Sequence, residues 1–497
     1  MVLATLAVAL ASFMNILDTT IAVVAVPTIS GNLGATPSQG SWIFTIYSVC
    51  LAVVLPLSGW ISRRYGQVRV FCIALLLFTF TSWLCAIAET FNQLLLFRAF
   101  QGASGGLLVA LSQSLLLMIF PAEKHGLALG IWGITSAVAP VLGPVIGGYI
   151  TDNFGWPWIF LINLPVGAFS VYICWTLLPP FESETRRDPV DFVGLLLLMV
   201  GVICFQLFLD RGHELDWLAS TQMRVLLVVS VLCFFLFLAW EVGEEHPVVD
   251  LSLFTYRNFV TGTALVTVLY VSFVLATVLQ PIWLQTAMGY NATWAGLVLA
   301  PFGILPILLM PLVGQRLKRW DARLVISIGI CIFVFAYLML ARASTETTAQ
   351  YIATGRLIMG LAMPFAWMPL MLLALVGLPA EKTASATGIF NFVRMLASSM
   401  GTAVGVTLWD QRTIYHRSQL AETISADSPQ YQHAMDLMAQ RLPESESALA
   451  ALDRAVTIQA STLALNDIFY LSAAGVATLA VIAWLLPARS ASEDGAQ

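Results

Sequence analysis

The chain has 497 residues, of which 59% are hydrophobic and 10% are charged, and its formal net charge is −5. A soluble domain carries about 25% charged residues, so this sequence has too few polar side chains to cover soluble domains. An acidic balance without a basic stripe also argues against nucleic-acid binding, and a polytopic helical membrane protein is the class that remains.

Apolar runs of roughly 20 residues, the length that crosses a bilayer as a helix, recur along the whole chain. The first run lacks the basic segment and the small-residue cleavage site of a secretory signal, which predicts a retained first span. The seven cysteines lie in apolar runs and are expected to pack as small apolar side chains. Fourteen spans are predicted, at residues 4–27, 41–60, 69–88, 93–119, 126–150, 157–178, 192–209, 223–241, 259–286, 293–315, 323–342, 350–376, 383–409 and 466–487.

Basic residues in the short loops predict the orientation of these spans. Arg63, Arg64 and Lys124 belong to loops on the side of the N-terminus, where most of the lysines and arginines gather. Both termini are therefore predicted to be cytoplasmic. The one long loop, residues 410–465, then lies on the outer side.

An internal repeat divides the chain. The segment Pro121-Ala-Glu-Lys124 recurs as Pro379-Ala-Glu-Lys382, and the same offset of 258 residues aligns Arg98 with Arg356. Eight spans separate the copies, so both halves have the same orientation, as in transporters whose halves rock about a central site. The predicted fold is all-α: an N-terminal six-helix half (1–180), an inserted helix pair (181–257), a C-terminal six-helix half (258–487) and a cytoplasmic tail (488–497).

Asp18 is the one acidic residue that lies well inside a predicted span, because the other acids sit at span ends. An acid there costs roughly 2.5–3.5 kcal/mol on insertion scales, which makes it a candidate functional residue. Arg98 lies at a similar depth in the fourth span. We interpret Asp18 as a proton-binding acid whose charge depends on the proximity of Arg98; a static salt bridge is the alternative.

Arg356 and Arg394 are also predicted to be buried, without acids of comparable depth in their half. Each is expected to meet backbone carbonyls, an anionic substrate or a partner across the interface between the halves. For Arg356, hydrogen bonds to backbone carbonyls are at least as strongly expected as a functional contact. For Arg394, exposure to a cavity and burial away from it are expected equally.

The fifth span combines prolines, which remove helix hydrogen bonds, with glycines, which permit close helix approach. The equivalent span of the second half keeps the glycines and lacks the prolines, so a bending or sealing element is expected in one half; a packing face is the alternative. The residues concerned are Pro140, Gly143, Pro144, Gly147 and Gly148.

The loop between the second and third spans holds Gly59, Arg63, Arg64 and Gly66. Its basic residues set the topology. The glycines, and a similar segment at 314–323, also indicate a cytoplasmic gate between helix ends.

Together these segments resemble the major facilitator superfamily, in its 14-helix drug/proton antiporter branch. Residues 17–27 are similar to the first-span signature of the branch, residues 98–102 to its motif associated with proton transfer, and residues 143–148 to its antiporter motif. Residues 155–167 and 249–259 match its pattern as well, so the likeness extends over almost the whole chain.

The resemblance implies a proton-coupled multidrug exporter that works by alternating access, is driven by the proton gradient and needs no cofactor or metal. It implies a bacterial inner-membrane location, with a periplasmic membrane-fusion adaptor and an outer-membrane channel as partners. Small amphiphilic drugs are the implied substrates. The candidate residues of a substrate cavity are Asn15, Gln101, Gln113, Tyr270, Gln280, Asn391 and Arg394.

The sequence departs from the branch at Arg63, where an acid is common, so a carboxylate-based gate is doubtful in that loop. The tenth span lacks the acid seen in some members that favour cationic drugs, which favours neutral, weakly acidic or amphiphilic substrates. Residues 410–465 are interpreted as helical, and are either a cap over the outer mouth or a docking surface for the adaptor.

Proton-coupled uptake on the same fold is the alternative function, and the antiporter motif and the outer segment argue against it. A membrane-embedded enzyme is poorly supported, because no metalloprotease or nucleotide-binding motif is present. A passive channel is disfavoured by the two-half repeat.

Overall fold

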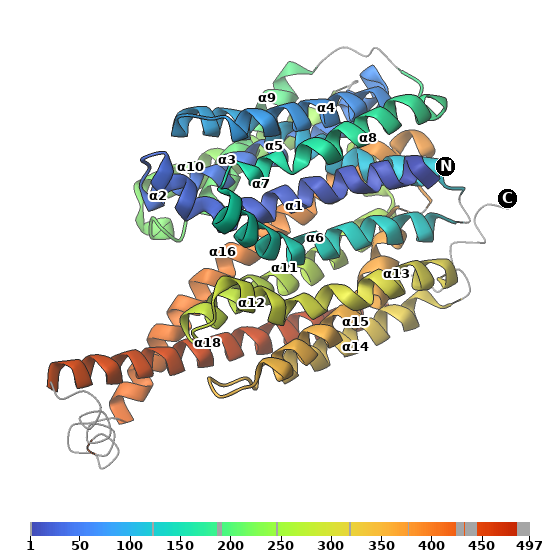
Figure 1. Ribbon diagram of the computed structural model, residues 1–497. Coiled ribbons are helices and arrows are strands. Elements are labelled where there is room, and N and C mark those ends of the chain that lie inside the picture. Colours follow the sequence, from blue (N-terminus) through green and yellow to red (C-terminus); the bar gives the residue numbers. More distant parts are fainter. Residues whose placement is uncertain are drawn as a thin grey trace.

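The computed structural model describes residues 2–121, 124–185, 191–244, 247–317, 320–375, 377–423, 432 and 445–484. Every regular element in these ranges is a helix, and the long helices run along one common direction (Figure 1). Thirteen described helices are long and apolar enough to cross a membrane, and a bent pair within α6 brings the number to as many as fourteen. The predicted all-helical, multi-span fold is confirmed.

Local sequence explains several helix ends in the N-terminal half. Gly66, with a φ of 91°, follows the last turn of α3, in which Arg63 and Arg64 complement the helix dipole. Thr90 caps α5 by accepting a hydrogen bond from the backbone N–H of Gln93. The helices of this half are α1 (Val2–Asn32), the short α2 (Pro37–Gly40), α3 (Trp42–Tyr65), α4 (Gln67–Ala86), α5 (Phe91–Ile119), α6 (His125–Phe154), α7 (Trp158–Leu161) and α8 (Asn163–Leu177).

The C-terminal half has one broken span. Its second span changes from α12 to α13 through a short 3₁₀ segment, Ala300–Gly303, that contains Pro301, because proline cannot donate the next helix hydrogen bond. The helices of this half are α11 (Arg257–Thr286), α12 (Ala292–Leu299), α13 (Ile304–Arg316), α14 (Ala322–Leu340), α15 (Ala349–Leu375), α16 (Thr383–Thr423) and α18 (Ser445–Ala483).

The inserted pair, α9 (Phe192–Arg211) and α10 (Thr221–Glu241), lies at one flank of the molecule. Helix α9 packs against α3 of one half and α16 of the other. Large apolar side chains of α10 such as Val228 and Phe235 are 64% and 68% exposed, as expected where a helix faces lipid. The exact domain boundaries stay a prediction.

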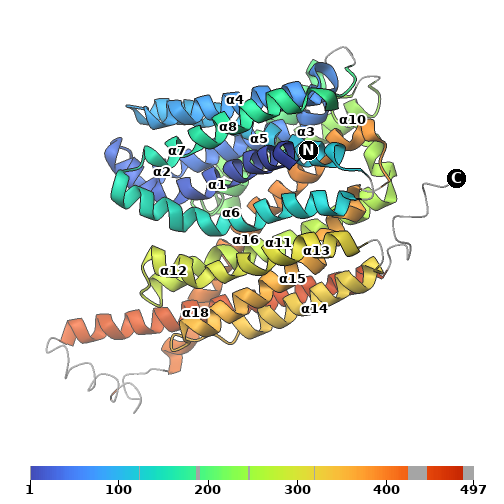
Figure 2. The same ribbon diagram turned by 45° about the vertical axis from the view of Figure 1, so that its right-hand side comes forward.

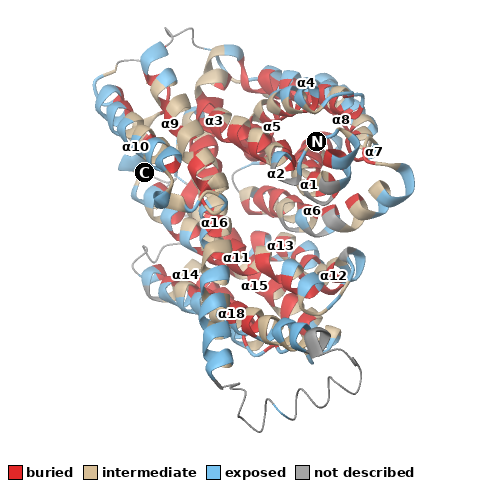
Figure 3. Cartoon of the chain, turned by 90° about the vertical axis from the view of Figure 1, so that its left-hand side faces the viewer, coloured by how far each residue is buried: buried red, intermediate tan, exposed pale blue. Residues whose placement is uncertain are grey.

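The two halves lie side by side, with α6, α11, α13 and α16 along the boundary between them (Figures 1 and 2). We call the end at which α1 begins the inner end, and the opposite end the outer end. Viewed from the outer end, buried residues gather where helices face one another and exposed residues surround the bundle (Figure 3).

The predicted outer loop is helical where it is described. Helix α16 continues past the predicted span end at residue 409 to Thr423, and α18 begins at Ser445, about twenty residues before the predicted start of the last span. No Gly or Pro interrupts residues 410–423 or 445–465, so helix propagation continues into water. Residues 424–431 and 433–444 lie outside the described residues, as does the tail at 488–497.

Candidate functional site

Asp18 and Arg98 form a buried ion pair in the N-terminal half. The Arg98 guanidinium donates from Nη1 to Asp18 Oδ2 at 2.6 Å, and both side chains are almost completely enclosed. A charge in the membrane interior is tolerated when it is paired and hydrogen-bonded. The similar depth that the sequence predicts for these residues thus becomes a direct contact between α1 and α5.

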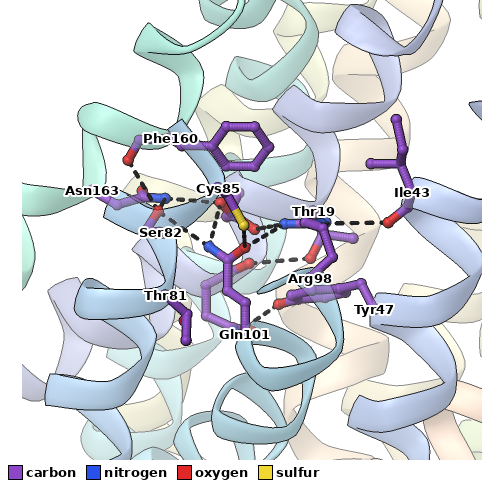
Figure 4. A network of polar contacts seen from close by, with 12 residues as sticks. Thr19, Ile43, Tyr47, Thr81, Ser82, Cys85, Arg98, Gln101, Phe160 and Asn163 are labelled. Atoms are coloured by element: carbon purple, nitrogen blue, oxygen red, sulfur yellow. Dashed lines mark hydrogen bonds and ion pairs between the residues drawn. The ribbon is translucent and has the colours of Figure 1, made fainter. Parts of the chain in front are cut away.

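Three neutral residues complete the network around Asp18 (Figure 4). Gln101, one turn after Arg98 on α5, accepts from Arg98 Nη1 at 2.8 Å and donates to Asp18 Oδ1 at 3.1 Å. Asn163 at the start of α8 donates to the same carboxylate oxygen at 2.8 Å and to Ser82 Oγ at 2.9 Å. The carboxylate therefore joins α1, α5 and α8, and Ser82 extends the network to α4.

The cation is held by aromatic rings as well as by the carboxylate. The Arg98 guanidinium carbon lies 4.2 Å from the ring centroid of Tyr47 and 5.6 Å from that of Phe160, a cation–π arrangement. Asn15 donates to the Tyr47 hydroxyl at 2.9 Å. Asn15 and Gln101, which are predicted cavity residues, both belong to this network.

The antiporter motif packs against the helix that carries Asp18. A Cβ added at Gly143 would lie 2.0 Å from Thr20 Oγ1, and one added at Gly147 would lie 3.1 Å from the backbone oxygen of Ile21. These two glycines therefore let α6 approach α1 beside the acid. Helix α6 is bent by 49° between His125–Pro140 and Val145–Phe154.

The remaining residues of the motif contribute differently. Pro140 is exposed at the bend, and a Cβ added at Gly148 would meet no atom within 4 Å. Pro144 lies in the helix, and its side chain is outside the described part of the structure.

A second polar cluster lies between the two halves, and it collects four of the seven predicted cavity residues. Asn391 on α16 donates to Gln113 on α5 at 2.7 Å, across the boundary. Arg394, one turn later on α16, donates to Asn391 Oδ1 and to the Tyr270 hydroxyl, both at 3.3 Å. We call Gln113, Tyr270, Asn391 and Arg394 the interface cluster.

The interface cluster is rich in hydrogen-bond donors and aromatic surface. The Arg394 guanidinium lies 5.5 Å from the Trp132 ring centroid, and no acidic side chain among the described residues forms an ion pair with it. Gln113 Nε2 and Trp367 Nε1 are buried without a described partner. A cation and free donors beside aromatic rings suit an amphiphilic molecule with an acceptor or anionic end.

Gln280, another predicted cavity residue, belongs to a third group of hydrogen-bonded side chains. It accepts a hydrogen bond from Arg356 Nε, and Arg356 Nη1 donates to Thr277 Oγ1 at 3.4 Å. Arg356 is 2% exposed. The described partners of Arg356 are thus side chains of α11 in its own half.

The inner end is closed by close helix crossings between the halves. A Cβ added at Gly59 would lie 2.2 Å from Ser385 Oγ, and Arg63 Nη1 donates to the same hydroxyl at 2.5 Å. Gly126 of α6 and Gly314 of α13 meet backbone to backbone in the same way. Gly59 and Arg63 were predicted to lie in a loop, but α3 continues through both of them, and they take part in an inner contact between α3 and α16.

The two remaining residues of the predicted gate loop, Arg64 at the end of α3 and Gly66 between α3 and α4, play local roles. Arg64 stacks near Trp60, 5.9 Å from its ring centroid. At Gly66 an added Cβ would meet the carboxylate of Glu182, which accepts from the backbone N–H groups of Val68 at 2.9 Å and Arg69 at 3.0 Å. Glu182 thus caps α4 from a distant segment, which no local pattern could reveal.

The inserted pair buries acids that the sequence places only at span ends. Asp191 and Glu241 are 7% and 3% exposed, and each has one carboxylate oxygen without a described partner. Asp210 is partly buried at the other end of α9, also with an unpartnered oxygen. Hydropathy marks these positions as ends of spans, and tertiary packing encloses them.

The outer extensions of α16 and α18 form a groove of about 450 Å³. Ion pairs of 2.6 Å join Arg412 to Asp467 and Arg417 to Asp453 across the two helices. The groove is lined mainly by apolar side chains, with a few polar ones: Ile414, Arg417, Ser418, Ala421, Leu449, Leu452, Asp453 and Val456.

Comparison with known proteins agrees with this architecture. The profile of the Major Facilitator Superfamily matches residues 8–402. Multidrug export protein EmrB of Haemophilus influenzae is 42% identical over 487 residues, which cover 97% of this chain and 95% of that protein. Fatty acid resistance protein FarB of Neisseria gonorrhoeae is 39% identical over 481 residues, covering 97% and 95%.

A solved structure supports the fold independently. The proton:xylose symporter XylE, also of this superfamily, superposes with a TM-score of 0.59 at 14% identity, covering 97% of this chain and 95% of that one. At this identity the likeness concerns the fold. The chain belongs to the major facilitator superfamily.

Proposed function

We propose that this chain is a proton-coupled multidrug exporter of the EmrB type, working by alternating access and driven by the proton gradient without a cofactor. The observation that carries the proposal is the Asp18–Arg98 pair, an acid and its counterion enclosed inside one half of a two-half transporter fold. The relatives with the highest identity named above are an export protein and a resistance protein. Those names favour export over uptake.

Proton binding at Asp18 changes the forces that hold the N-terminal half together. With Asp18 ionised, its carboxylate accepts from Arg98, Gln101 and Asn163. A proton on either oxygen removes the charge that attracts Arg98 and replaces an acceptor by a donor. The helices α1, α5 and α8 then lose their common anchor, and α6 packs on α1 directly beside it. Protonation can therefore change the position of the helix that also contacts α13 and α12 of the other half.

Substrate binding is proposed at the interface cluster. The hydrogen bond between Gln113 and Asn391 joins the halves, so a ligand that inserts there must replace it. Arg394 provides a cation for a carboxylate or another acceptor, and Trp132 and Tyr270 provide aromatic surface. Amphiphilic compounds, including weak acids, fit this chemistry. The name of the fatty acid resistance relative is consistent with such substrates.

The outer extensions are proposed as the docking surface for a periplasmic membrane-fusion adaptor, which links the pump to an outer-membrane channel. The groove near Leu449 and Val456 offers apolar contacts beyond the spans. This arrangement requires a bacterial inner-membrane location with both termini cytoplasmic, as the basic loops predict.

Transport by purified protein in proteoliposomes with an imposed pH gradient tests the proposal. Asp18→Asn should abolish gradient-driven drug accumulation while the protein still inserts and folds. Asp152→Asn, which removes an exposed acid of α6, is the matched control and should transport normally. Normal export by Asp18→Asn, or accumulation in the direction of proton flow, would sink the antiport assignment.

A further inference from the structure

Asp210 is a second partly buried acid, and it lies on α9, the helix of the inserted pair that packs against both halves. It sits at the outer end of α9, and this helix packs against α3 of the N-terminal half and α16 of the C-terminal half. The inserted pair is therefore in contact with both moving parts of the transporter. Nothing in the proton network around Asp18 involves Asp210.

Polar contacts connect the Asp210 carboxyl to both halves. Gln206, one turn earlier on α9, donates from Nε2 to Asp210 Oδ1 at 3.0 Å and to Ser399 Oγ on α16 at 2.7 Å. The hydroxyl of Thr45 on α3 also interacts with the carboxyl. Asp210 Oδ2 is buried and has no hydrogen-bond partner among the described residues. An ionised oxygen without a donor is costly to bury, and a bound proton removes that cost.

The charged groups around Asp210 are engaged elsewhere. Arg211, the last residue of α9, pairs with Glu214 at 3.0 Å, and His213 in the following turn pairs with Asp410 of α16 at 3.0 Å. At the start of α10, Arg224 donates to Thr221 at 2.9 Å. Thr45 and Trp42 lie at the outer end of α3, and the guanidinium of Arg211 stacks over the Trp42 ring. In the described part of the chain, no cation forms an ion pair with Asp210.

We propose that Asp210 is a proton-binding site, separate from Asp18, that takes up a proton from the outer side when the outer ends of α3, α9 and α16 come together. Separation of the two halves breaks the contact with Thr45 or the bridge through Gln206, and water then stabilises the ionised carboxylate. Asp210 releases its proton to the outer solution when the outer ends of the helices separate, and it binds a proton again when they come together. An acidic outer solution therefore favours the closed arrangement of this flank. The proposal rests on the alternating-access function.

Infrared and hydrogen-exchange measurements on the full chain in nanodiscs, without substrate, test the site directly with protons as the ligand. Acidification should produce a carboxylic-acid C=O band that is missing from Asp210→Asn and kept in Asp18→Asn. Amides at the outer ends of α3 and α9 should exchange several-fold more slowly in acid, after correction for intrinsic rates. Asp210→Asn, a neutral mimic of the protonated acid, should exchange slowly at every pH.

Asp216→Asn is the matched control, because Asp216 is an exposed acid in the loop that follows α9. Its φ is 54°, a conformation that Asn adopts readily. It should keep the band and the pH response. An unchanged band in Asp210→Asn, or a wild-type pH response of exchange in that variant, overturns the proposal. Neither the infrared band nor hydrogen exchange depends on transport. Failure of the Asp210 proposal can therefore be told apart from failure of the export proposal, which is tested by gradient-driven export in Asp18→Asn.

Discussion

The ion pair between Asp18 and Arg98 allows a quantitative test, in which each partner is removed alone and both are removed together. Asp18→Asn leaves the guanidinium of Arg98 buried without a counterion. Arg98→Met leaves the carboxylate of Asp18 buried without a counterion. Both side chains are at most 1% exposed, and the Nη1–Oδ2 distance is 2.6 Å. Breaking such a pair costs about 3–5 kcal/mol, whereas replacing both charges by neutral groups is often neutral.

Each single variant should therefore lose about 3–5 kcal/mol of unfolding free energy, and the double variant should lose far less than the sum. The coupling energy should therefore be at least about 3 kcal/mol, which is the upper end of the usual range for residues in direct contact. Arg98→Met should be less destabilised in acid than at neutral pH, because a proton can neutralise the orphaned carboxylate. Asp152→Asn should behave as wild type.

Unfolding in mixed micelles with a denaturing detergent, followed by circular dichroism, gives the four free energies of the cycle. Additivity within about 0.5 kcal/mol would refute a functional pair in a low-dielectric site. Transport by the double variant separates the two interpretations of the pair. A static salt bridge predicts that restored stability restores export, whereas proton coupling predicts a stable protein without gradient-driven export.

Three further predictions concern other parts of the molecule. Gly143→Val places side-chain atoms against Thr20, and should reduce export strongly while Gly148→Val, at an open position, has little effect in the same vesicle assay. Arg394→Gln should weaken binding of carboxylate-bearing substrates about tenfold, the equivalent of about 1.4 kcal/mol, and leave neutral substrates almost unaffected in equilibrium binding measurements. At the inner end, burial alone would raise the pKa of Asp250, but hydrogen bonds from Ser252 and Lys382 and the charge of Lys382 hold it below its usual value. Asp250→Asn should therefore lower thermal stability at neutral pH, and the difference from wild type should disappear as the pH falls below about 4.

The depth of residues in the membrane could be predicted from the sequence, because hydropathy and span length fix where a helix enters and leaves the bilayer. Depth alone suggested that Asp18 and Arg98 could meet, and they do. The repeat also predicted two halves of equal orientation around an inserted pair. These predictions depend on positions along one axis, which a sequence records directly.

The direction in which a side chain points around its helix could not be predicted, because helices enclosed by protein and lipid show little contrast between their faces. Gln101 and Gln113 lie on the same helix and were predicted to share a cavity. One contacts Asp18 and the other contacts Asn391 across the boundary between the halves. Asn163 was part of a matched motif without an assigned role, and its bond to Asp18 depends on the tertiary placement of α8.

The repeat gives the two halves equivalent arginines with different partners. This difference indicates which half couples proton binding to movement. Arg98 faces a carboxylate, whereas Arg356 is bonded to the neutral amide of Gln280, so proton binding at Asp18 changes the charge of one half alone. Helix α5 carries both Arg98 and Gln113, fifteen residues and about 22 Å apart along the helix axis. A stiff helix with Asp18 bonded near one end and Asn391 bonded near the other cannot move at the first contact without disturbing the second. We therefore propose that release of Arg98 by protonation is transmitted along α5 to the bond between Gln113 and Asn391 at the proposed substrate site.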